Sequence, residues 1–533
     1  MFNKKLSVIS YLLFVILIIA AFFRLYNINQ TPPGLYPDEA MNGNNALEAI
    51  AAGNWKNFYP ENNGREGLFI NIQALSIIIF GNQPWALRGV SAIFGIFTVL
   101  GIYFLTKKLF ENYKIENSEL IALLSAFLIA VSFWHINFSR IGFRAIMAPF
   151  FLTWAVYFIL KSFDPVRNNS EALPAKNSSD SASSLEISNG VGEEKYKNTI
   201  IAGIFYGLGF YSYIAYRATP LLILIIFIYW FLKFRDLRKE IVKKFIVFTL
   251  TSIIVFAPLG YYFLTHPQDF FGRTAQISVF SSPAPLKTLA LNVVKTAGMF
   301  NFSGDLNWRH NYAGTPELFW PIGIMFLVGI FFGFISFLKN FKLKIENYFP
   351  FLILFSWLVI AALPVVVSGE GIPHALRAII MIPPVFILAG FGGVLIYENL
   401  KSQISNLKIT NKNYRILKNI LFVACCLLLV TIIFSAYQTY FIKWANNQNT
   451  KDAFDRTSVL IGRELNSLPK ELPKYVIVSR NGVDVRGVPM PSQTIMFITD
   501  TFTPDKQKEK NIFYVLPDQV NQIPQGAYIV ILE

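Results

Sequence analysis

Long apolar runs follow one another along most of this chain and are separated by short polar segments. A helix that crosses a bilayer needs about 20 mostly apolar residues to span ~30 Å of hydrocarbon. Eleven runs approach that length, at roughly 6–24, 84–106, 119–138, 146–162, 197–214, 219–233, 244–264, 318–338, 349–367, 376–396 and 418–440. The pattern predicts a polytopic α-helical membrane protein with about 11 transmembrane helices.

One further apolar run, at 67–81, is shorter and contains Asn71 and Gln73. Its length suits an interfacial or re-entrant helix better than a span. If it does not cross and the N-terminus is inside, most Lys and Arg residues before 441 fall in cytoplasmic segments, as the positive-inside rule requires. We therefore predict juxtamembrane helices in a first outer loop (25–83), a second outer loop (265–317), and a C-terminal tail on the outside.

Two regions differ from this pattern. Residues 164–194 are rich in Ser, Asn, Glu and Ala without apolar periodicity, which predicts a flexible cytoplasmic loop. After 440 the apolar runs become short and are bounded by Pro, Gly or charge, which indicates strands. These lie at 475–478, 494–498, 511–516 and 528–532, with a helix expected over 452–468. We expect a transmembrane domain over 1–440 and a small soluble α/β domain over 441–533.

Composition agrees with a membrane protein. The chain is 54% hydrophobic and 15% charged, whereas soluble proteins carry about 25% charged residues. The net charge of +15 would suggest nucleic acid in a soluble protein, but here it reflects basic cytoplasmic loops. The expected partners are membrane lipids and no nucleic acid. The adjacent Cys425 and Cys426 lie in an apolar run and indicate small packing residues, not a disulfide or metal site.

Charged side chains gather at the outer ends of the predicted spans, where they are costly unless they have a use. Asp38 and Glu39 follow a Pro- and Gly-rich turn just outside the first span. Other outer segments contribute Arg65, Glu66, Arg140, Arg144, Arg217, Asp305, Arg309, His310, Asn311, His374 and Arg377. The predicted topology alone therefore places two carboxylates and several arginines in one leaflet.

This combination suits transfer of a sugar from a lipid phosphate. Arginine can hold the phosphate through two hydrogen bonds and stabilise its charge as it leaves. A carboxylate can accept the proton of the acceptor hydroxyl. Each residue also has a structural alternative: Asp38 as a turn residue, Glu39 as a helix cap, and the arginines as snorkelling side chains. The four His residues show no metal-ligand spacing, which argues against a His-based metal centre.

Several segments resemble the GT-C superfamily of membrane glycosyltransferases. Residues 32–40, Pro-Pro-Gly-Leu-Tyr-Pro-Asp-Glu-Ala, are similar to its acidic loop motif, and residues 64–70, 80–81 and 85–90 are similar to its juxtamembrane helix and second span. The resemblance covers about 1–400. It is closest to the protein O-mannosyltransferase-like branch (glycosyltransferase family 39-like), with the lipid A aminoarabinose transferase as a relative. It implies a GT-C fold and inverting transfer from a polyprenyl-phosphate sugar to an acceptor protein, lipid or glycan of the cell envelope.

The resemblance also implies roles for individual residues. Asp38 resembles the catalytic acidic residue, and Glu39 resembles its neighbour, which supports the loop or binds a metal; we count both as candidate catalytic residues. Arg217 resembles a basic residue that contacts the lipid phosphate, and His374 and Arg377 fall where the family has another phosphate-binding group. No acidic residue matching the aminoarabinose branch lies near 140–144. Apart from the resemblance, we also count Arg65, Glu66, Arg140 and Arg144 as candidates for binding the substrate or its phosphate. Arg65 and Glu66 occupy the place of an acidic–basic pair in that branch, but the order is reversed and Gly67 replaces Pro, which puts a metal role for Glu66 in doubt. No cofactor follows with certainty, and a divalent metal on Glu39 or Glu66 is left open.

Two other functions remain as alternatives. A flippase or transporter for a lipid-linked saccharide would also need outer arginines, but it predicts charges at mid-membrane and repeat symmetry between halves, and the sequence shows neither. A non-catalytic cell-envelope assembly protein would use the tail as a binding module. We expect a multi-pass plasma-membrane enzyme whose active site and C-terminal domain face the extracytoplasmic side.

Overall fold

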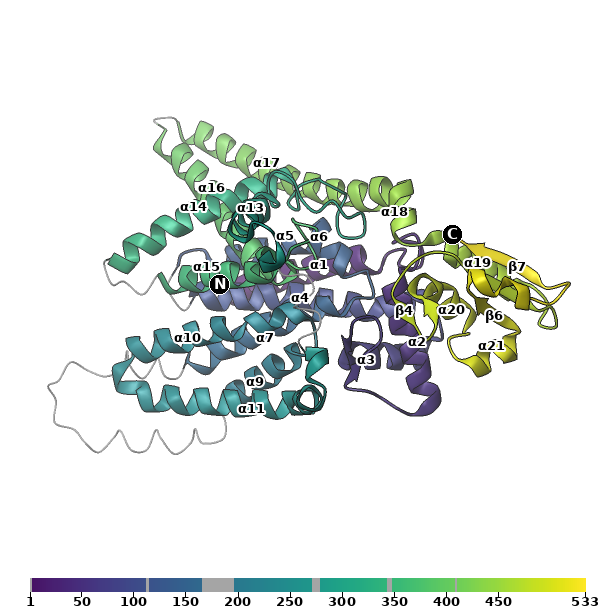
Figure 1. Cartoon of the computed structure of the whole chain (residues 1–533). Helices are drawn as coiled ribbons and strands as arrows, with labels where there is room; N and C mark the ends of the chain where they lie inside the picture. The colour runs from purple at the N-terminus through teal and green to yellow at the C-terminus, as the bar shows by residue number, and fades with distance from the viewer. Residues whose placement is uncertain (1, 112–114, 165–195, 271–278, 343–347, 408–409) are drawn as a thin grey trace.

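A computed structural model of the chain describes residues 2–111, 115–164, 196–270, 279–342, 348–407 and 410–533. Apart from its first residue, the predicted flexible loop 164–194 lies outside these ranges. The described part is a helical bundle whose loops at one end meet a small mixed segment from the C-terminus (Figure 1).

The bundle confirms the predicted helical membrane fold. Within the described ranges, nine helices are long and apolar enough to cross a membrane. They match nine of the eleven predicted spans. The other two are shorter, because 119–138 is divided into α5 (Ser118–Ala130) and α6 (Phe133–Phe138) and 197–214 forms only α9 (Lys197–Gly209). The nine apolar helices are α1 (Phe2–Leu25), α4 (Pro84–Glu111), α7 (Met147–Ser162), α10 (Pro220–Lys233), α11 (Arg238–Thr265), α14 (Trp320–Lys342), α15 (Phe349–Val366), α16 (Ile382–Asn406) and α17 (Asn411–Tyr437). Of these, α7 and α10 reach spanning length only together with the helical turns that precede them, so that the spans run over Arg144–Ser162 and Ile214–Lys233. The exact number of spans therefore stays a prediction.

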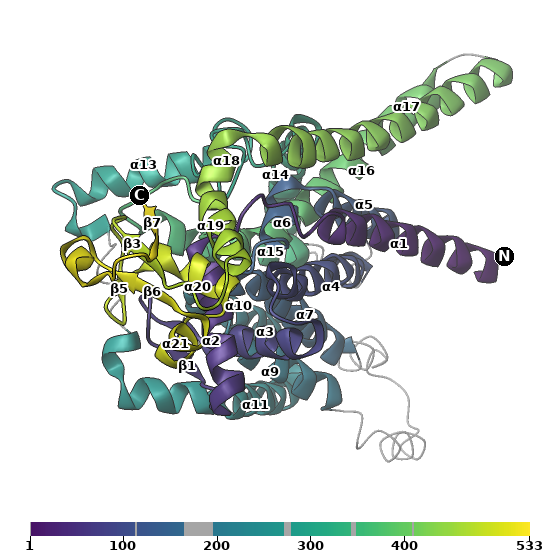
Figure 2. The ribbon, with the colours of Figure 1, turned by 90° about the vertical axis from the view of Figure 1, so that its right-hand side faces the viewer.

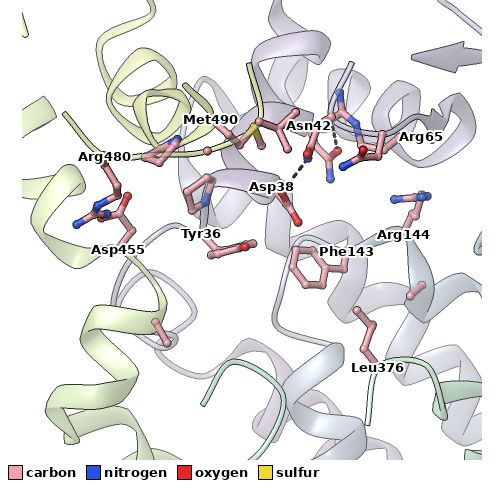
Figure 3. A pocket seen from close by; sticks show the side chains of 18 of the residues that line it. Tyr36, Asp38, Asn42, Arg65, Phe143, Arg144, Leu376, Asp455, Arg480 and Met490 are labelled. Atoms are coloured by element: carbon pink, nitrogen blue, oxygen red, sulfur yellow. Dashed lines mark hydrogen bonds and ion pairs between the residues drawn. The ribbon is translucent and has the colours of Figure 1, made fainter. Parts of the chain in front are cut away.

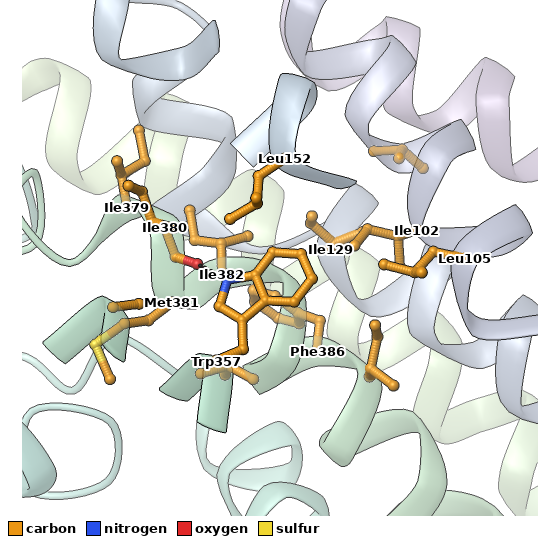
Figure 4. Packing of buried hydrophobic residues seen from close by; sticks show 14 of the residues in the cluster. Ile102, Leu105, Ile129, Leu152, Trp357, Ile379, Ile380, Met381, Ile382 and Phe386 are labelled. Atoms are coloured by element: carbon orange, nitrogen blue, oxygen red, sulfur yellow. Dashed lines mark hydrogen bonds between the residues drawn. The ribbon is translucent and has the colours of Figure 1, made fainter. Parts of the chain in front are cut away.

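Close packing holds the bundle together. In lipid, helices associate through packing and interhelical hydrogen bonds more than through transfer from water. Trp357 of α15 is buried and donates from Nε1 to the carbonyl of Ile380 at 2.9 Å, beside the side chains of Leu152 and Phe386 (Figure 4). Where α14 crosses α16, a Cβ added to Gly392 would lie 2.0 Å from the Met325 carbonyl oxygen. This fixed core holds the outer loops in place.

The first outer loop is itself ordered. It contains α2 (Pro37–Ala52), an antiparallel pair of β1 (Phe58–Tyr59) and β2 (Arg65–Glu66), and α3 (Gly67–Phe80). The fourteen residues of α3 are too few to span a bilayer as a helix. The juxtamembrane helices predicted in this loop are thus present.

The C-terminal segment, defined here as residues 448–533, has a three-stranded parallel sheet in the order β6-β3-β7. Its strands are β3 (Lys474–Val478), β6 (Ile512–Val515) and β7 (Tyr528–Leu532), and β4 (Asp484–Val485) pairs with β5 (Val488–Pro489) in a small hairpin. Its helices are α18 (Gln448–Ala453), α19 (Arg456–Ser467), α20 (Gln493–Thr499) and α21 (Pro504–Lys510).

Most elements of this segment were predicted, with one error. The strands at 475–478, 511–516 and 528–532 and the helix within 452–468 are confirmed. The strand predicted at 494–498 is wrong, because these residues form α20. A short apolar run has the same appearance in a buried strand and a buried helix, and α20 is buried between α2 and α19.

The C-terminal segment packs directly on the first outer loop, with α20 beside α2 (Figures 1 and 2). A Cβ on Gly43 of α2 would lie 2.3 Å from the Phe497 ring, so only glycine allows this approach. Thr494 Oγ1 donates to the Leu35 carbonyl at 2.9 Å, and Asn44 Nδ2 donates to Gln493 Oε1 at 2.9 Å. The division of the chain at residue 440 remains a prediction.

Candidate active site

A cavity of about 440 Å³ lies where the loops at this end of the bundle meet the C-terminal segment (Figure 3). Residues from the first outer loop, from the turns after α6 and α9, and from the C-terminal segment line it. They include Tyr36, Asp38, Asn42, Asn62, Arg65, Phe143, Arg144, Tyr213, Leu376, Asp455, Arg480 and Met490. The structure thus brings Asp38, Arg65 and Arg144, three of the predicted site residues, to one pocket.

Asp38 is partly exposed in the first turn of α2, where the helix dipole favours negative charge. Its Oδ1 accepts a hydrogen bond from Asn62 Nδ2 at 2.8 Å. Asn62, Asn63 and Gly64 all have positive φ, at 53°, 62° and 79°, and Asn and Gly tolerate this conformation best. This turn directs the Asn62 amide onto the carboxylate.

Glu39 is buried and points to other partners. Arg88 forms an ion pair with it, with Nε 3.0 Å from Oε2 and Nη2 3.2 Å from Oε1. The N–H of Gly142 donates to Oε2 at 2.8 Å, and the N–H of Tyr36 donates to Oε1 at 3.3 Å. Glu39 does not line the pocket, and both its oxygens are occupied. The structure therefore supports its loop-holding role and gives no support to the catalytic or metal-binding role predicted for it.

Arg65 is buried and also lines the pocket. Its Nη1 donates to Asn42 Oδ1 at 2.7 Å and its Nη2 to Asn45 Oδ1 at 2.5 Å. Burial and then the charge of Arg144 lower the pKa of Arg65 to about 10, while the charge of Asp38 opposes this change. Arg65 is therefore positively charged at neutral pH and contributes that charge to the pocket.

Glu66 connects two arginines. Arg144 Nε donates to Glu66 Oε2 at 2.6 Å, and Arg217 Nη2 lies 3.9 Å from Glu66 Oε1. Arg217 also stacks on the Phe270 ring at 4.1 Å, next to an apolar groove along α11 that Phe263 and Phe270 line. Two guanidinium groups against one carboxylate leave a net positive charge between the polar pocket and the groove. A metal role for Glu66 gains no support, because both its oxygens face arginine.

Arg140 is fully buried and faces away from the pocket. Its guanidinium donates to the carbonyls of Phe23, Tyr26 and Thr31 at 2.8–2.9 Å. These bonds hold the end of α1 against the turn after α6. The phosphate-binding role predicted for Arg140 therefore has no support in the structure.

His374 and Arg377 belong to a neighbouring polar cluster and do not line the pocket. Asp305 Oδ2 lies 3.0 Å from His310 Nδ1 and 3.8 Å from His374 Nδ1. Burial lowers the pKa of His374 to about 3, and the electrostatic effects of His310 and Arg377 add to this change, while the charge of Asp305 opposes it. This imidazole is therefore neutral at pH 7. The ligand atoms of these three residues lie within 4.8 Å of one another. The lack of metal-ligand spacing in the sequence does not exclude such a cluster, because loops far apart in sequence bring these residues together.

Some pocket residues were missed from the sequence. Asp455 and Arg480 form an ion pair at 3.1 Å on the wall that the C-terminal segment provides. The Arg309 guanidinium lies 4.0 Å from the ring centre of Tyr36, and burial, with the charge of Asp38, raises the pKa of Tyr36 to about 12. The Asn-Asn-Gly sequence at 62–64 favours a turn and could have been recognised locally, whereas the other contacts depend on how distant segments pack.

Comparison with known proteins supports the same fold. Residues 68–173 match the family described as "Dolichyl-phosphate-mannose-protein mannosyltransferase". No curated protein sequence matches the chain. Among solved structures, the oligosaccharyltransferase AglB of Archaeoglobus fulgidus, in complex with an inhibitory peptide and a dolichol phosphate, matches with a TM-score of 0.55 and 14% identity. This match covers 93% of the chain and 64% of AglB, so the chain spans less than two thirds of that protein.

A second similar structure is ArnT of Cupriavidus metallidurans in the apo state, with a TM-score of 0.51 and 12% identity over 93% of this chain and 84% of ArnT. AglB in complex with zinc and sulfate matches with a TM-score of 0.53 and 14% identity, covering 97% of this chain and 64% of that one. At these identities the likeness concerns the fold. The chain therefore shares the GT-C fold of AglB and ArnT, as its resemblance to that superfamily predicted, and its residues 68–173 match the mannosyltransferase family described above.

Proposed function

We propose that this protein is a membrane glycosyltransferase that moves a sugar from a polyprenyl-phosphate donor to a hydroxyl acceptor on the extracytoplasmic side. The observation that carries the proposal is the pocket that Asp38, Arg65 and Arg144 line together. The GT-C fold and the family match over residues 68–173 add to it. The distribution of basic residues along the sequence supports the extracytoplasmic position.

In the proposed step, the acceptor oxygen attacks the anomeric carbon while the bond from that carbon to the phosphate oxygen breaks. The acceptor proton passes to Asp38, which acts as general base. The electron pair of the broken bond stays on the polyprenyl phosphate, and arginines stabilise its charge. A single displacement of this kind inverts the anomeric centre. Asn62 holds the carboxylate in position for the proton transfer.

Arg144 and Arg217 are the proposed phosphate ligands. They share Glu66, and Arg217 adjoins the apolar groove on α11 that is lined by Phe256, Phe263, Leu264 and Phe270. An isoprenoid chain needs such an apolar surface, and its phosphate needs a cation beside it. That AglB was solved with dolichol phosphate supports a donor of this class. The sugar, the acceptor and any metal dependence are left open by these contacts.

Substitution of Asp38 tests the proposal. Cells that lack the gene would be complemented with the wild-type chain, with Asp38→Asn, or with Asp505→Asn as an exposed control in α21. Mass spectrometry of surface glycans and glycolipids should show a sugar modification that the wild type and Asp505→Asn restore. Asp38→Asn should reach the membrane in equal amount without restoring it.

Retention of polyprenyl phosphate by the purified Asp38→Asn protein would show that the donor site is intact. Full restoration of the modification by Asp38→Asn would overturn the assignment of the base and favour a transport or assembly role.

A further inference from the structure

We propose that Asp305, His310 and His374 form a binding site for a divalent transition metal, separate from the pocket around Asp38. One carboxylate and two imidazoles are a common donor set for zinc and related ions. Asp305 and His310 come from the loop between α13 (Pro285–Gly298) and α14, whereas His374 comes from the loop between α15 and α16. The ion would join two outer loops.

The spacing of the donor atoms fits an ion. Ligand atoms on a tetrahedral zinc lie about 3.3 Å apart, because each metal–ligand bond is ~2.0–2.1 Å long. Asp305 Oδ2 is 3.0 Å from His310 Nδ1 and 3.8 Å from His374 Nδ1. These distances lie on either side of the ideal value, so small side-chain rotations would place both imidazoles on one ion.

Two acceptor atoms face each other in the cluster. The N–H of Arg377 donates to His374 Nδ1 at 3.4 Å, so this nitrogen carries a lone pair. The same nitrogen lies near Asp305 Oδ2, which is also an acceptor. A cation between two acceptors would satisfy both. His310 Nδ1 would coordinate the ion once its proton has moved to Nε2, and its ring would remain neutral.

The carboxylate is already oriented as a metal ligand. The N–H of Asn307 donates to Asp305 Oδ1 at 2.8 Å, and the N–H of Ala375 donates to Oδ2 at 2.8 Å. Hydrogen bonds of this kind orient metal ligands. Glu317, which is also buried, accepts the N–H of Asp305 at 3.0 Å and adds a second carboxyl group nearby. Preorganisation lowers the cost of forming the site.

Two arginines near the cluster oppose a cation. Their guanidinium groups have other partners: Arg309 stacks on Tyr36, and Arg377 Nη1 donates to the Glu370 carbonyl at 2.7 Å. Their charge weakens metal binding, so we expect a chelator to remove the ion. Because Arg309 lies between the ligands Asp305 and His310 in the sequence and contacts Tyr36 of the pocket, the ion would position Arg309 without taking part in bond breaking.

Metal loading of the purified protein tests the site without any sugar substrate. Tag-free protein in detergent would be stripped with a chelator, loaded with Zn²⁺ or Co²⁺, desalted, and analysed by elemental mass spectrometry and visible absorption. The wild type should retain one ion per chain and show the ligand-field bands of Co²⁺. His374→Ala and His310→Ala should lose both signals. His266→Ala, at an exposed histidine next to Tyr262, should retain them.

Thermal unfolding provides a second readout. Zn²⁺ should raise the melting temperature of the wild type and of His266→Ala and leave that of His374→Ala unchanged. His374 is partly exposed, so we expect its alanine variant to fold. In the absence of metal, this variant should elute from a size-exclusion column at the same volume as the wild type. Wild-type protein that holds no more metal than His374→Ala would overturn the proposal, and so would full metal retention by both ligand variants.

Discussion

Asn62 donates a hydrogen bond to Asp38 at 2.8 Å and so connects the turn between β1 and β2 to the first turn of α2. The residue before it, Glu61, accepts a hydrogen bond from Arg486 of the C-terminal segment at 2.8 Å. Arg486 also makes two hydrogen bonds to Glu48 of α2, at 2.8 and 2.9 Å. A continuous series of contacts thus links the last part of the chain to the proposed base.

Replacing Asn62 should slow the reaction without removing the base. Asn62→Ala loses a hydrogen bond to a charged group, which contributes about 1.5–3 kcal/mol. If this bond fixes the carboxylate during proton transfer, kcat should fall about 10- to 100-fold, with little change in donor binding. Steady-state kinetics would measure this. Asn63→Ala is the neighbouring control, and equal losses in both variants would contradict a specific role for Asn62.

The ion pair of Glu39 and Arg88 should matter for stability. Both side chains are 1% exposed or less, and removal of one partner from a buried pair costs about 3–5 kcal/mol. Arg88→Ala should therefore lower the melting temperature markedly, while Arg463→Ala, at an exposed position of α19, should not. Thermal unfolding in detergent would measure the difference. A melting temperature for Arg88→Ala close to that of the wild type would contradict this account.

Arg140 and Arg144 should separate stability from donor binding although they are four residues apart. Arg140→Gln loses hydrogen bonds to three carbonyls and should lower the melting temperature. Arg144→Gln should weaken polyprenyl-phosphate binding about tenfold or more, because it removes a charged hydrogen-bond donor. Each variant would be assayed for lipid affinity and for thermal unfolding. If the Arg140→Gln protein were as stable as the wild type but bound polyprenyl phosphate more weakly, Arg140 would have to be counted among the phosphate ligands.

Arg486 should hold the C-terminal segment against the first loop. Arg486→Gln removes the partly exposed ion pairs to Glu48 and Glu61. Exposed pairs contribute about 0.2–1 kcal/mol each, so the global stability should change little. The local opening of the turn at residues 60–64 should change more. Hydrogen exchange at residues 60–64 should become faster in Arg486→Gln than in Lys506→Gln, whose lysine pairs with Asp500 and Glu509 inside the same segment. Unchanged hydrogen exchange at residues 60–64 would contradict the proposal that Arg486 holds the C-terminal segment against the first loop.

The same contact predicts a pH dependence. Burial opposes ionisation of Glu61, but the hydrogen bond and charge of Arg486, together with a backbone hydrogen bond and the charge of Lys56, outweigh it and lower the pKa of Glu61 below 4.5. The unfolded chain binds this proton first, so the contribution to stability is present above pH 4.5 and is lost as the pH falls through the lower folded value. The difference in melting temperature between wild type and Arg486→Gln should therefore stay constant down to about pH 5 and shrink below 4.5.

The membrane helices could be predicted because a bilayer demands long apolar runs and leaves few alternatives. The short helix at 67–80 followed from its length and from the charges around it. The helix at 494–498 could not be distinguished from a strand in the sequence, because the partners that bury these residues, α2 and α19, come from distant parts of the chain. The break between α5 and α6 likewise lies inside a run that reads as continuously apolar.

Part of the candidate site could be predicted. The predicted topology places the turns that hold Asp38 and Arg144 at the same end of the bundle, and both residues do line one pocket. It does not determine side-chain direction, since Arg140 and Arg144 share one turn and face opposite sides. Asp455 and Arg480 gave no sequence signal, because they reach the pocket only through the packing of α20 on α2.

Arg480 and Met490 of the C-terminal segment form one wall of the pocket that Tyr36 and Asp38 also line. This arrangement has a consequence for biogenesis. The ribosome synthesises Asp38 soon after the first helix, whereas this wall is synthesised only after α17. During synthesis the carboxylate therefore lies in a pocket that still lacks one wall. A chain truncated before α18 would lack this wall of the pocket, because Arg480 and Met490 both come after α18 in the sequence.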